Sequence, residues 1–158
     1  MPVLGWRGPM AQKYAFVMMT KEKWWSRFVS DNHQGKQIQS YVQKGVAPPK
    51  RASIILFYVT KPTGNIAGYA EFIERVVGDT MEIWRKYGKE SVLRTDKEYR
   101  EFIGDKLQVS FVRFQNLCEA RYAVSRMAVL ASRGTERLSR KGFYIDTETA
   151  QKFIALMS

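Results

Sequence analysis

The strongest constraint on the fold is a pair of strand-like segments in the middle of the chain. Residues 53–60 (SIILFYVT) form an apolar run of strand length, and residues 66–77 (IAGYAEFIERVV) follow a long alternating pattern. Between them, residues 61–65 (KPTGN) contain Pro62 and Gly64, which supply the backbone geometry of a turn. The sequence therefore predicts a hairpin made of a core strand and a long partner strand.

Upstream of this hairpin, the pattern predicts a strand, a helix and an edge strand. Residues 14–19 (YAFVMM) are apolar and rich in β-formers, and Thr20 is a suitable N-cap for a helix over 21–29. Residues 36–42 alternate as an edge strand does, with Ile38 and Val42 inward and Tyr41 off that register. A loop over 45–53 contains two consecutive prolines, which cannot donate to a central ladder.

Downstream, two short helices are marked by capping boxes. Asp79 with Glu82 opens one, and Thr95 with Glu98 opens the other. Beyond them we expect a strand at 107–114 with Leu107, Val109 and Phe111 on one face, a strand at 121–130, a basic loop at 133–141, a strand at 142–145 and a helix at 147–157. Because strands and helices do not alternate as βαβ units, the expected fold is α+β, a mixed, partly closed barrel of about six strands with short peripheral helices. We expect one domain over 13–158, ending in the helix, after an N-terminal extension over 1–12.

Charge is distributed unevenly along the chain. The 26 Lys and Arg against 15 Asp and Glu give a formal net charge of +11, which suits a polyanionic partner. No acidic residue lies between Asp31 and Glu71, and residues 106–145 contain eight basic side chains against two acidic ones. The segment between these two is roughly neutral. If both basic segments meet in the fold, they form one phosphate-binding surface; otherwise they are separate solvated faces.

Residues that could support catalysis or metal binding are scarce. His33 is the only histidine and Cys118 the only cysteine, so no zinc site of the usual kind can be assembled, and no phosphate-loop, dinucleotide or nucleophile-elbow motif is present. We predict no cofactor, no metal site and no catalytic set. The N-terminus lacks the apolar stretch of a signal peptide, and the longest apolar run, 54–59, is far shorter than the ~20 residues of a membrane span. These features favour a cytoplasmic protein without a membrane partner.

Several aromatic residues lie close to cations in the sequence, as grooves for nucleic acid require. Lysine and arginine would contact phosphates, and Trp25 or Tyr41 would stack on a base, although tryptophan is also a common core residue. The predicted nucleic-acid-binding residues are Trp24, Trp25, Arg27, Lys36, Tyr41, Lys44, Lys50, Arg51, Lys61 and Arg126.

The order of these elements resembles the PUA-like superfamily, in particular its EVE and ASCH domains and an archaeal branch related to them. The resemblance rests on the opening strand and tryptophan-bearing helix (14–29), on Gly35-Lys36, and above all on the segment SIILFYVTKPTGNIAGYAEF. It covers roughly residues 13–146. It implies a pseudo-barrel that binds RNA or modified bases in a cleft beside the opening helix.

The chain departs from the ASCH pattern at two places. After Gly35-Lys36 the sequence is QIQSY instead of a Glu-x-Arg-like pair, and Lys50-Arg51 stand where a Gly-Asp is common. The leading hypothesis is therefore a non-catalytic domain that binds RNA or another nucleic acid. The alternatives are an ASCH-type hydrolase, for which Glu71 is the candidate acid, and a basic domain that docks a protein partner.

Overall fold

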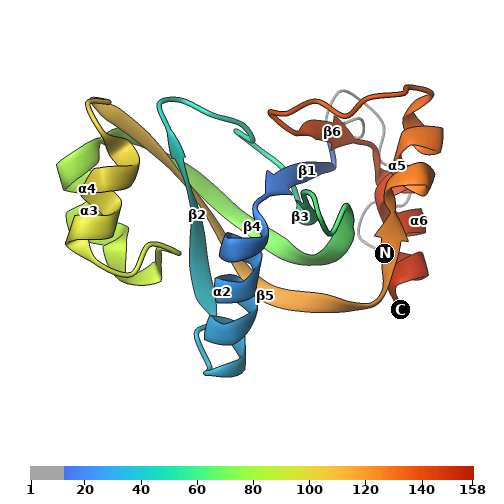
Figure 1. Cartoon of the computed structure of the whole chain (residues 1–158), viewed down its shortest axis with the longest axis horizontal. Coiled ribbons are helices and arrows are strands. Elements are labelled where there is room, and N and C mark those ends of the chain that lie inside the picture. The colour runs from blue at the N-terminus through green and yellow to red at the C-terminus, as the bar shows by residue number, and fades with distance from the viewer. Residues whose placement is uncertain (1–12) are drawn as a thin grey trace.

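A six-stranded mixed sheet is the centre of the computed structural model, which describes residues 13–158 (Figure 1). The predicted N-terminal extension over 1–12 lies outside the described residues. The strands are β1 (Ala15–Thr20), β2 (Ile38–Lys44), β3 (Ile54–Val59), β4 (Asn65–Asp79), β5 (Gln108–Ser125) and β6 (Phe143–Ile145), in the order β2-β5-β4-β3-β1-β6. β1 and β3 are parallel, and every other neighbouring pair is antiparallel. The α+β prediction with about six strands is confirmed, as a curved sheet whose edges, β2 and β6, do not pair with each other.

The helices lie at the front and at both ends of this sheet. Helix α2 (Glu22–His33) follows β1 and crosses in front of the strands in Figure 1. At one end are α3 (Thr80–Tyr87), the 3₁₀ turn η1 (Gly88–Glu90) and α4 (Asp96–Ile103), and at the other are α5 (Arg126–Arg133) and α6 (Thr147–Met157). No helix within residues 13–158 has the length and apolarity needed to cross a bilayer.

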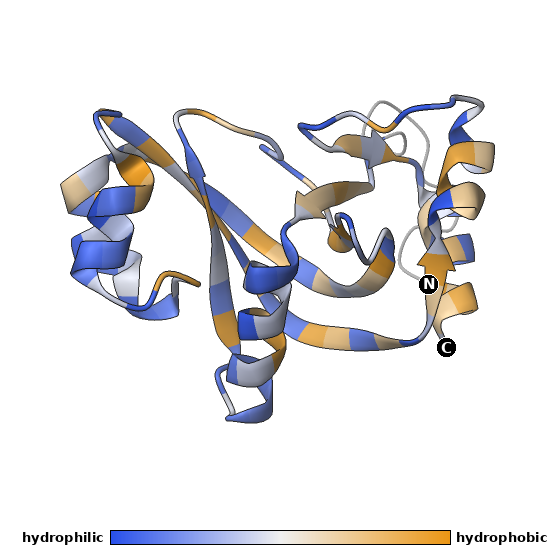
Figure 2. Cartoon of the chain, in the orientation of Figure 1, coloured by the Kyte–Doolittle hydropathy of each residue, from blue (hydrophilic) through white to orange (hydrophobic). Residues whose placement is uncertain are grey.

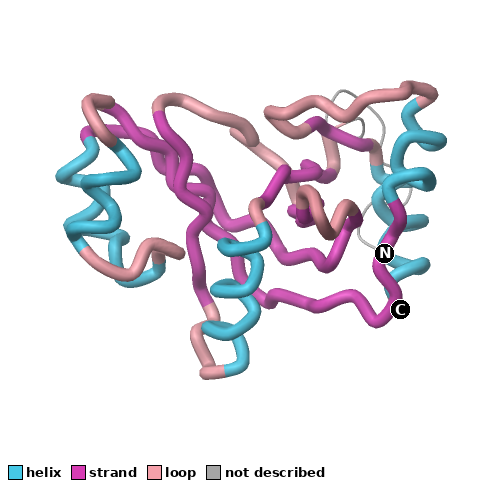
Figure 3. The backbone as a smooth tube through the Cα atoms, viewed as in Figure 1, coloured by secondary structure: helices cyan, strands magenta, loops and turns pink. Residues whose placement is uncertain are grey.

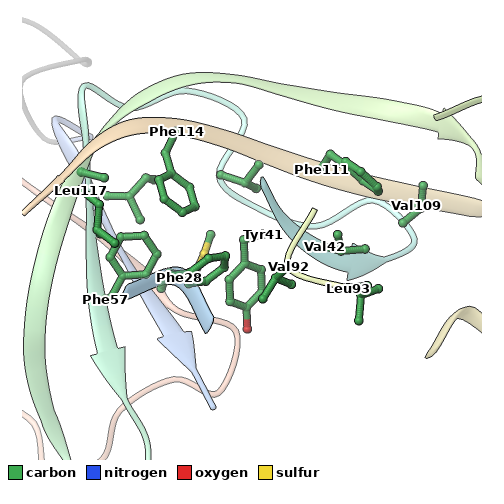
Figure 4. Close-up of a cluster of buried hydrophobic side chains, with 14 of the residues drawn as sticks. Phe28, Tyr41, Val42, Phe57, Val92, Leu93, Val109, Phe111, Phe114 and Leu117 are labelled. Carbon is green, nitrogen blue, oxygen red and sulfur yellow. The ribbon is translucent and has the colours of Figure 1, made fainter. Parts of the chain in front are cut away.

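The predicted hairpin is present as β3 and β4, and β3 is buried on both faces. Ile55 and Phe57 belong to one apolar cluster, whereas Leu56 and Tyr58 belong to another. The first cluster lies beneath α2 and is centred on aromatic rings, with Phe114 5.1 Å edge-on from both Phe28 and Phe57 (Figure 4). The second lies under α5 and α6. Burial on both faces explains why this strand is an unbroken apolar run in the sequence.

Helix α2 approaches the sheet closely at a glycine of β4. A Cβ atom on Gly68 would lie 2.5 Å from the carbonyl oxygen of Cys118 and 2.6 Å from the ring of Trp25. Trp25 fills this space and packs against Phe57, with ring centroids 5.3 Å apart. The glycine therefore sets how closely the tryptophan-bearing helix packs on the sheet.

Several predicted boundaries and orientations are wrong. Residues 126–133 form a helix, because the Ser125 side chain accepts a hydrogen bond from the Ala128 amide and caps it, while β5 runs unbroken to Ser125. Leu107 is 82% exposed, because it lies before β5 in the preceding turn. On β2, Tyr41 is buried and Ile38 is exposed. Helix α2 extends to His33, beyond the predicted end at residue 29, and its N-cap is Lys21 instead of Thr20.

Candidate nucleic-acid interface

Two adjoining hollows lie where β1, β2 and β3 end. The arginine pocket, of about 530 Å³, is lined by Met19, Tyr58, Thr60, Lys61, Arg126, Arg137, Leu138 and Arg140. The glutamine pocket, of about 410 Å³, is lined by Met19, Tyr41, Gln43, Lys44, Val46, Ala47, Pro48, Arg140 and Lys141. Met19 and Arg140 line both, so the two pockets adjoin, and together they are here named the basic cleft.

The cleft is built from strand ends and two loops. β1 and β3 run parallel and place Met19 and Tyr58 side by side at their carboxyl ends, where Met19 is the register partner of Tyr58. The loops over 45–53 and 134–142 lie along the same edge of the molecule (Figure 3). The second loop is largely hydrophilic (Figure 2), and it supplies Arg137, Arg140 and Lys141.

A glycine holds the 134–142 loop against the sheet. Gly142 has φ +83°, and a Cβ there would lie 2.5 Å from the carbonyl oxygen of Val17 and 2.6 Å from the ring of Phe16. Only a residue without a side chain fits both this backbone conformation and this approach. Arg140 and Lys141 directly precede it and are thereby brought to the cleft.

Among the described residues, six cations and no acidic side chain line the cleft. They are Lys44, Lys61, Arg126, Arg137, Arg140 and Lys141. Within residues 13–158, none of the six has a carboxylate within 4.0 Å. Like charges gathered without counter-charges repel one another, so the cleft attracts anions.

Hydroxyl groups lie among these cations. Burial raises the pKa of the Tyr58 hydroxyl, and nearby Arg126 partly offsets that rise. The Tyr41 hydroxyl donates to the carbonyl oxygen of Met19 at 2.9 Å, and burial raises its pKa to about 12. Because the residues as a whole are only 4% and 9% exposed, Tyr58 and Tyr41 present little flat surface for stacking.

The structure brings four of the ten predicted site residues into the cleft: Tyr41, Lys44, Lys61 and Arg126. Lys50 and Arg51 line a separate hollow beside β4. Trp25 lines another shallow hollow along α2, where His33 contacts Glu119 at 2.5 Å.

The remaining three predicted residues lie among ion pairs of the fold. Arg27 binds Glu98 through two hydrogen bonds of 2.7 and 2.9 Å, and its guanidinium lies 5.2 Å from the ring of Trp24. These hydrogen bonds, above all, hold the pKa of the Glu98 carboxyl down at about 2. Lys36 lies 3.5 Å from the Asp31 carboxylate and donates to the carbonyl oxygen of Ser91.

Sequence reasoning missed the loop residues that contribute half of the cleft's positive charge. Arg137, Arg140 and Lys141 belong to the basic loop expected at 133–141, and their density was the signal that could have selected them. Their convergence with β2 depends on Gly142 and on the sheet order, which no local pattern encodes. Glu71, the candidate acid of the hydrolase alternative, lines neither pocket and accepts hydrogen bonds from Gln115 and Asn116.

Comparison with known proteins identifies the fold. No protein-family model matches the chain. A relative named "ASCH domain-containing ribonuclease", from Zymomonas mobilis, is 27% identical over 78 residues, which are 49% of this chain and 51% of the relative. The match thus spans about half the length of that curated relative.

Solved structures of an ASCH protein from the same organism match nearly the whole chain. The crystal structure of a serine-to-alanine variant superposes with a TM-score of 0.76 at 19% identity, covering 93% of this chain and 99% of that one. The structure without a stated substitution gives 0.73 at 18% identity, covering 92% and 97%. The predicted resemblance to ASCH domains is therefore confirmed for the fold, which is ASCH-like.

Proposed function

We propose that the chain binds single-stranded nucleic acid, with RNA as the preferred partner, in the basic cleft. The observation that carries this proposal is the set of six cations without a carboxylate partner. Phosphate groups are the counter-charges that such a set fits best, because arginine binds them through two parallel hydrogen bonds. The name of the relative, a ribonuclease, supports RNA over DNA.

The shape of the cleft favours a single strand over a duplex. Duplex readers usually place a helix or a β-ribbon in a groove. Here Arg126, the first residue of α5, is the one helical residue among the described side chains that line the cleft. Two pockets of about 530 and 410 Å³ instead suit separate nucleotide units of a flexible strand.

The test is binding of a labelled single-stranded RNA of about ten nucleotides, a length within the range that single-strand binding folds cover. For a single strand, the logarithm of the binding constant falls by ~0.7 per phosphate contact for each tenfold rise in salt. One contact therefore contributes about fivefold to the affinity at ~0.1 M salt relative to ~1 M salt, and its loss costs that factor. Changing Arg126, Arg137 and Arg140 together to Gln should therefore weaken binding about a hundredfold.

A matched control removes the same charge elsewhere. Arg85, Lys86 and Lys89 lie on α3 and η1 at the opposite end of the molecule from α5. Changing these three to Gln should weaken RNA binding by less than about threefold, through the general field alone. Equal losses in both triple variants would mean that net charge, and not the cleft, binds RNA. Absence of RNA binding by the unaltered chain, together with tight binding of an acidic protein, would replace the proposal with protein docking.

RNA cleavage is a second candidate function, and the relative's name favours it. The described side chains that line the cleft include neither a histidine nor a carboxylate, so any proton transfer by them would fall to a hydroxyl or an amine. Tyr58 is the best placed group, because its hydroxyl shares the arginine pocket with Lys61 and Arg126. Tyr58→Phe should then abolish cleavage while RNA affinity stays within about twofold. Undiminished cleavage in this variant would exclude that role for Tyr58, and no cleavage by the unaltered chain would leave the binding function alone.

A further inference from the structure

We propose that an RNA strand bound in the basic cleft continues past the loop at 45–53 and makes further phosphate contacts with Lys50 and Arg51. This inference rests on the proposed function, since it assumes that a single strand occupies the cleft. It adds a second contact surface outside the two pockets of the cleft. It therefore concerns the length of RNA that one chain covers.

The second surface is the hollow beside β4, here named the β4 hollow. It has a volume of about 450 Å³ and is lined by Lys50 and Arg51 from the loop and by residues of β4 between Phe72 and Val77. Lys50 and Arg51 are both exposed. Within residues 13–158, neither has a carboxylate within 4.0 Å. The two adjacent cations therefore attract anions, as those of the cleft do.

The other charged side chains of the β4 hollow have partners within the fold. Glu74 is the acidic residue among the described residues that line it, and its carboxylate contacts Arg113. Arg75 donates from Nη1 to the Ala47 carbonyl oxygen at 2.9 Å. Three cations thus line this hollow against one carboxylate, and that carboxylate is paired elsewhere.

The β4 hollow lies directly beside the cleft. Ala47, which accepts the hydrogen bond from Arg75, also lines the glutamine pocket, so this one contact joins the two hollows. Pro48 lines the glutamine pocket and Lys50 the β4 hollow. Because they are two residues apart, their Cα atoms are separated by at most ~7 Å. A strand that leaves the glutamine pocket along the loop therefore meets Lys50 and Arg51 within a few nucleotides.

Backbone hydrogen bonds hold the loop that carries these two cations. The Lys50 amide donates to the Tyr144 hydroxyl at 3.1 Å, and the Ser53 amide donates to the Tyr14 carbonyl oxygen at 2.7 Å. The loop is thus fixed on both sides of Arg51 before any ligand arrives. Fixing the backbone in advance reduces the ordering that a partner must impose on binding.

A nucleic-acid strand is the occupant that this arrangement favours. Its phosphates repeat along the whole strand, so one strand supplies counter-charges first to the cleft and then to the β4 hollow. An acidic protein segment could bind the β4 hollow without any use of the cleft. The length dependence of binding distinguishes these two occupants.

The experiment measures the affinity of single-stranded oligouridylates of about 4, 6, 8, 10 and 12 nucleotides at ~0.1 M salt, lengths that single-strand binding folds cover. For the unaltered chain, affinity should rise up to about 10 nucleotides. Lys50→Gln together with Arg51→Gln removes two phosphate contacts, so affinity for the longest RNA should fall about 25-fold. In this double variant affinity should stop rising at about 6 nucleotides, and affinity for the shortest RNA should stay within about twofold. Both side chains are exposed, so the melting temperature should be unchanged.

A matched control removes two charges from α3. Arg85→Gln together with Lys86→Gln should weaken binding by less than about threefold at every length and leave the length dependence as it is. The Arg126, Arg137 and Arg140 triple Gln variant should weaken binding at every length, because the cleft holds even the shortest RNA.

The outcomes separate this inference from the function on which it rests. If the unaltered chain binds none of the RNAs, the proposed function fails. If it binds them but the Lys50 and Arg51 double variant behaves as the α3 control does, the cleft binds RNA and the β4 hollow does not. A loss of equal size at every length would also overturn the inference, since it would show no extension of the bound strand. Loss of binding to an acidic peptide, with RNA binding intact, would assign Lys50 and Arg51 to a protein partner instead.

Discussion

Two regions of this molecule are rich in cations, but only one of them pairs those cations with carboxylates of the chain. Beside α3 and α4, arginines are paired within the fold: Arg113 contacts both Glu90 and Glu74, and Arg27 contacts Glu98. In the basic cleft, six cations line the two pockets, and none has a carboxylate within 4.0 Å among residues 13–158. The paired arginines have their counter-charges in the chain itself, whereas the cleft cations have no carboxylate within 4.0 Å among residues 13–158 and are neutralised by anions from outside that part of the chain. Net charge alone, at +11, does not reveal this division.

Removing an arginine from the ion pairs beside α3 and α4 should have the largest effect on stability. Arg113 is only 16% exposed, lies 2.7 Å from Glu90 and stacks over the ring of Tyr87. Arg113→Leu leaves two carboxylates without their partner, so we expect the free energy of unfolding in urea to fall by ~3 kcal/mol. RNA affinity should be unchanged. Arg85→Leu on the exposed face of α3 is the control, with a change within ~0.5 kcal/mol.

Introducing an acidic residue into the cleft should have the next largest effect. It should lower RNA affinity and leave the stability of the fold intact. Lys61→Glu removes one cation from the arginine pocket and adds an anion beside Arg126 and Arg137. RNA affinity should fall about 25-fold at ~0.1 M salt, as for two lost phosphate contacts. The melting temperature should stay the same or rise slightly, because like-charge repulsion in the cleft decreases. A clear loss of stability would show that the cleft cations stabilise the fold.

The smallest effect concerns the free energy of unfolding at low pH, through the ion pair of Arg27 with Glu98. The pKa of Glu98 in the folded chain is about 2, below its value in an unfolded chain, so its stabilising contribution is complete above about pH 4.5 and is lost as the pH falls toward 2. Unfolding experiments between pH 5 and pH 2.5 should show a loss of ~1 kcal/mol from this group, after allowance for solvent screening. Arg27→Gln should reduce this loss of stability between pH 5 and pH 2.5. An unchanged dependence of stability on pH would show that Arg27 does not hold down the pKa of Glu98.

Features set by local sequence could be predicted, whereas features set by tertiary contacts could not. Local signals were sufficient for the hairpin β3–β4 and for the N-caps of α3 and α4, since Asp79 accepts from the amides of Met81 and Glu82 and Thr95 accepts from that of Glu98. They could not assign burial along β2, where sheet order and the packing of α2 bury Tyr41 instead of Ile38.

Of the ten predicted site residues, four line the basic cleft, and tertiary contacts place the other six elsewhere. Arg27 and Lys36 lie near aromatic residues in the sequence, yet their acidic partners, Glu98 and Asp31, use their charge inside the fold. Arg137 and Arg140 belong to no sequence motif, but Gly142 and the parallel pairing of β1 with β3 bring them to the strand ends. Whether a cation is paired depends on tertiary contacts, which periodicity does not report.

The most direct test of this division is the salt dependence of RNA binding, measured for the unaltered chain and for the Arg126, Arg137 and Arg140 triple Gln variant. Each phosphate contact contributes ~0.7 to the slope of the logarithm of affinity against the logarithm of salt concentration. We predict a slope of about −3 or steeper for the unaltered chain. In the variant the slope should be shallower by about 2, because three contacts of ~0.7 each are lost. A slope that is the same in both proteins would contradict the assignment of the cleft as the phosphate-binding surface.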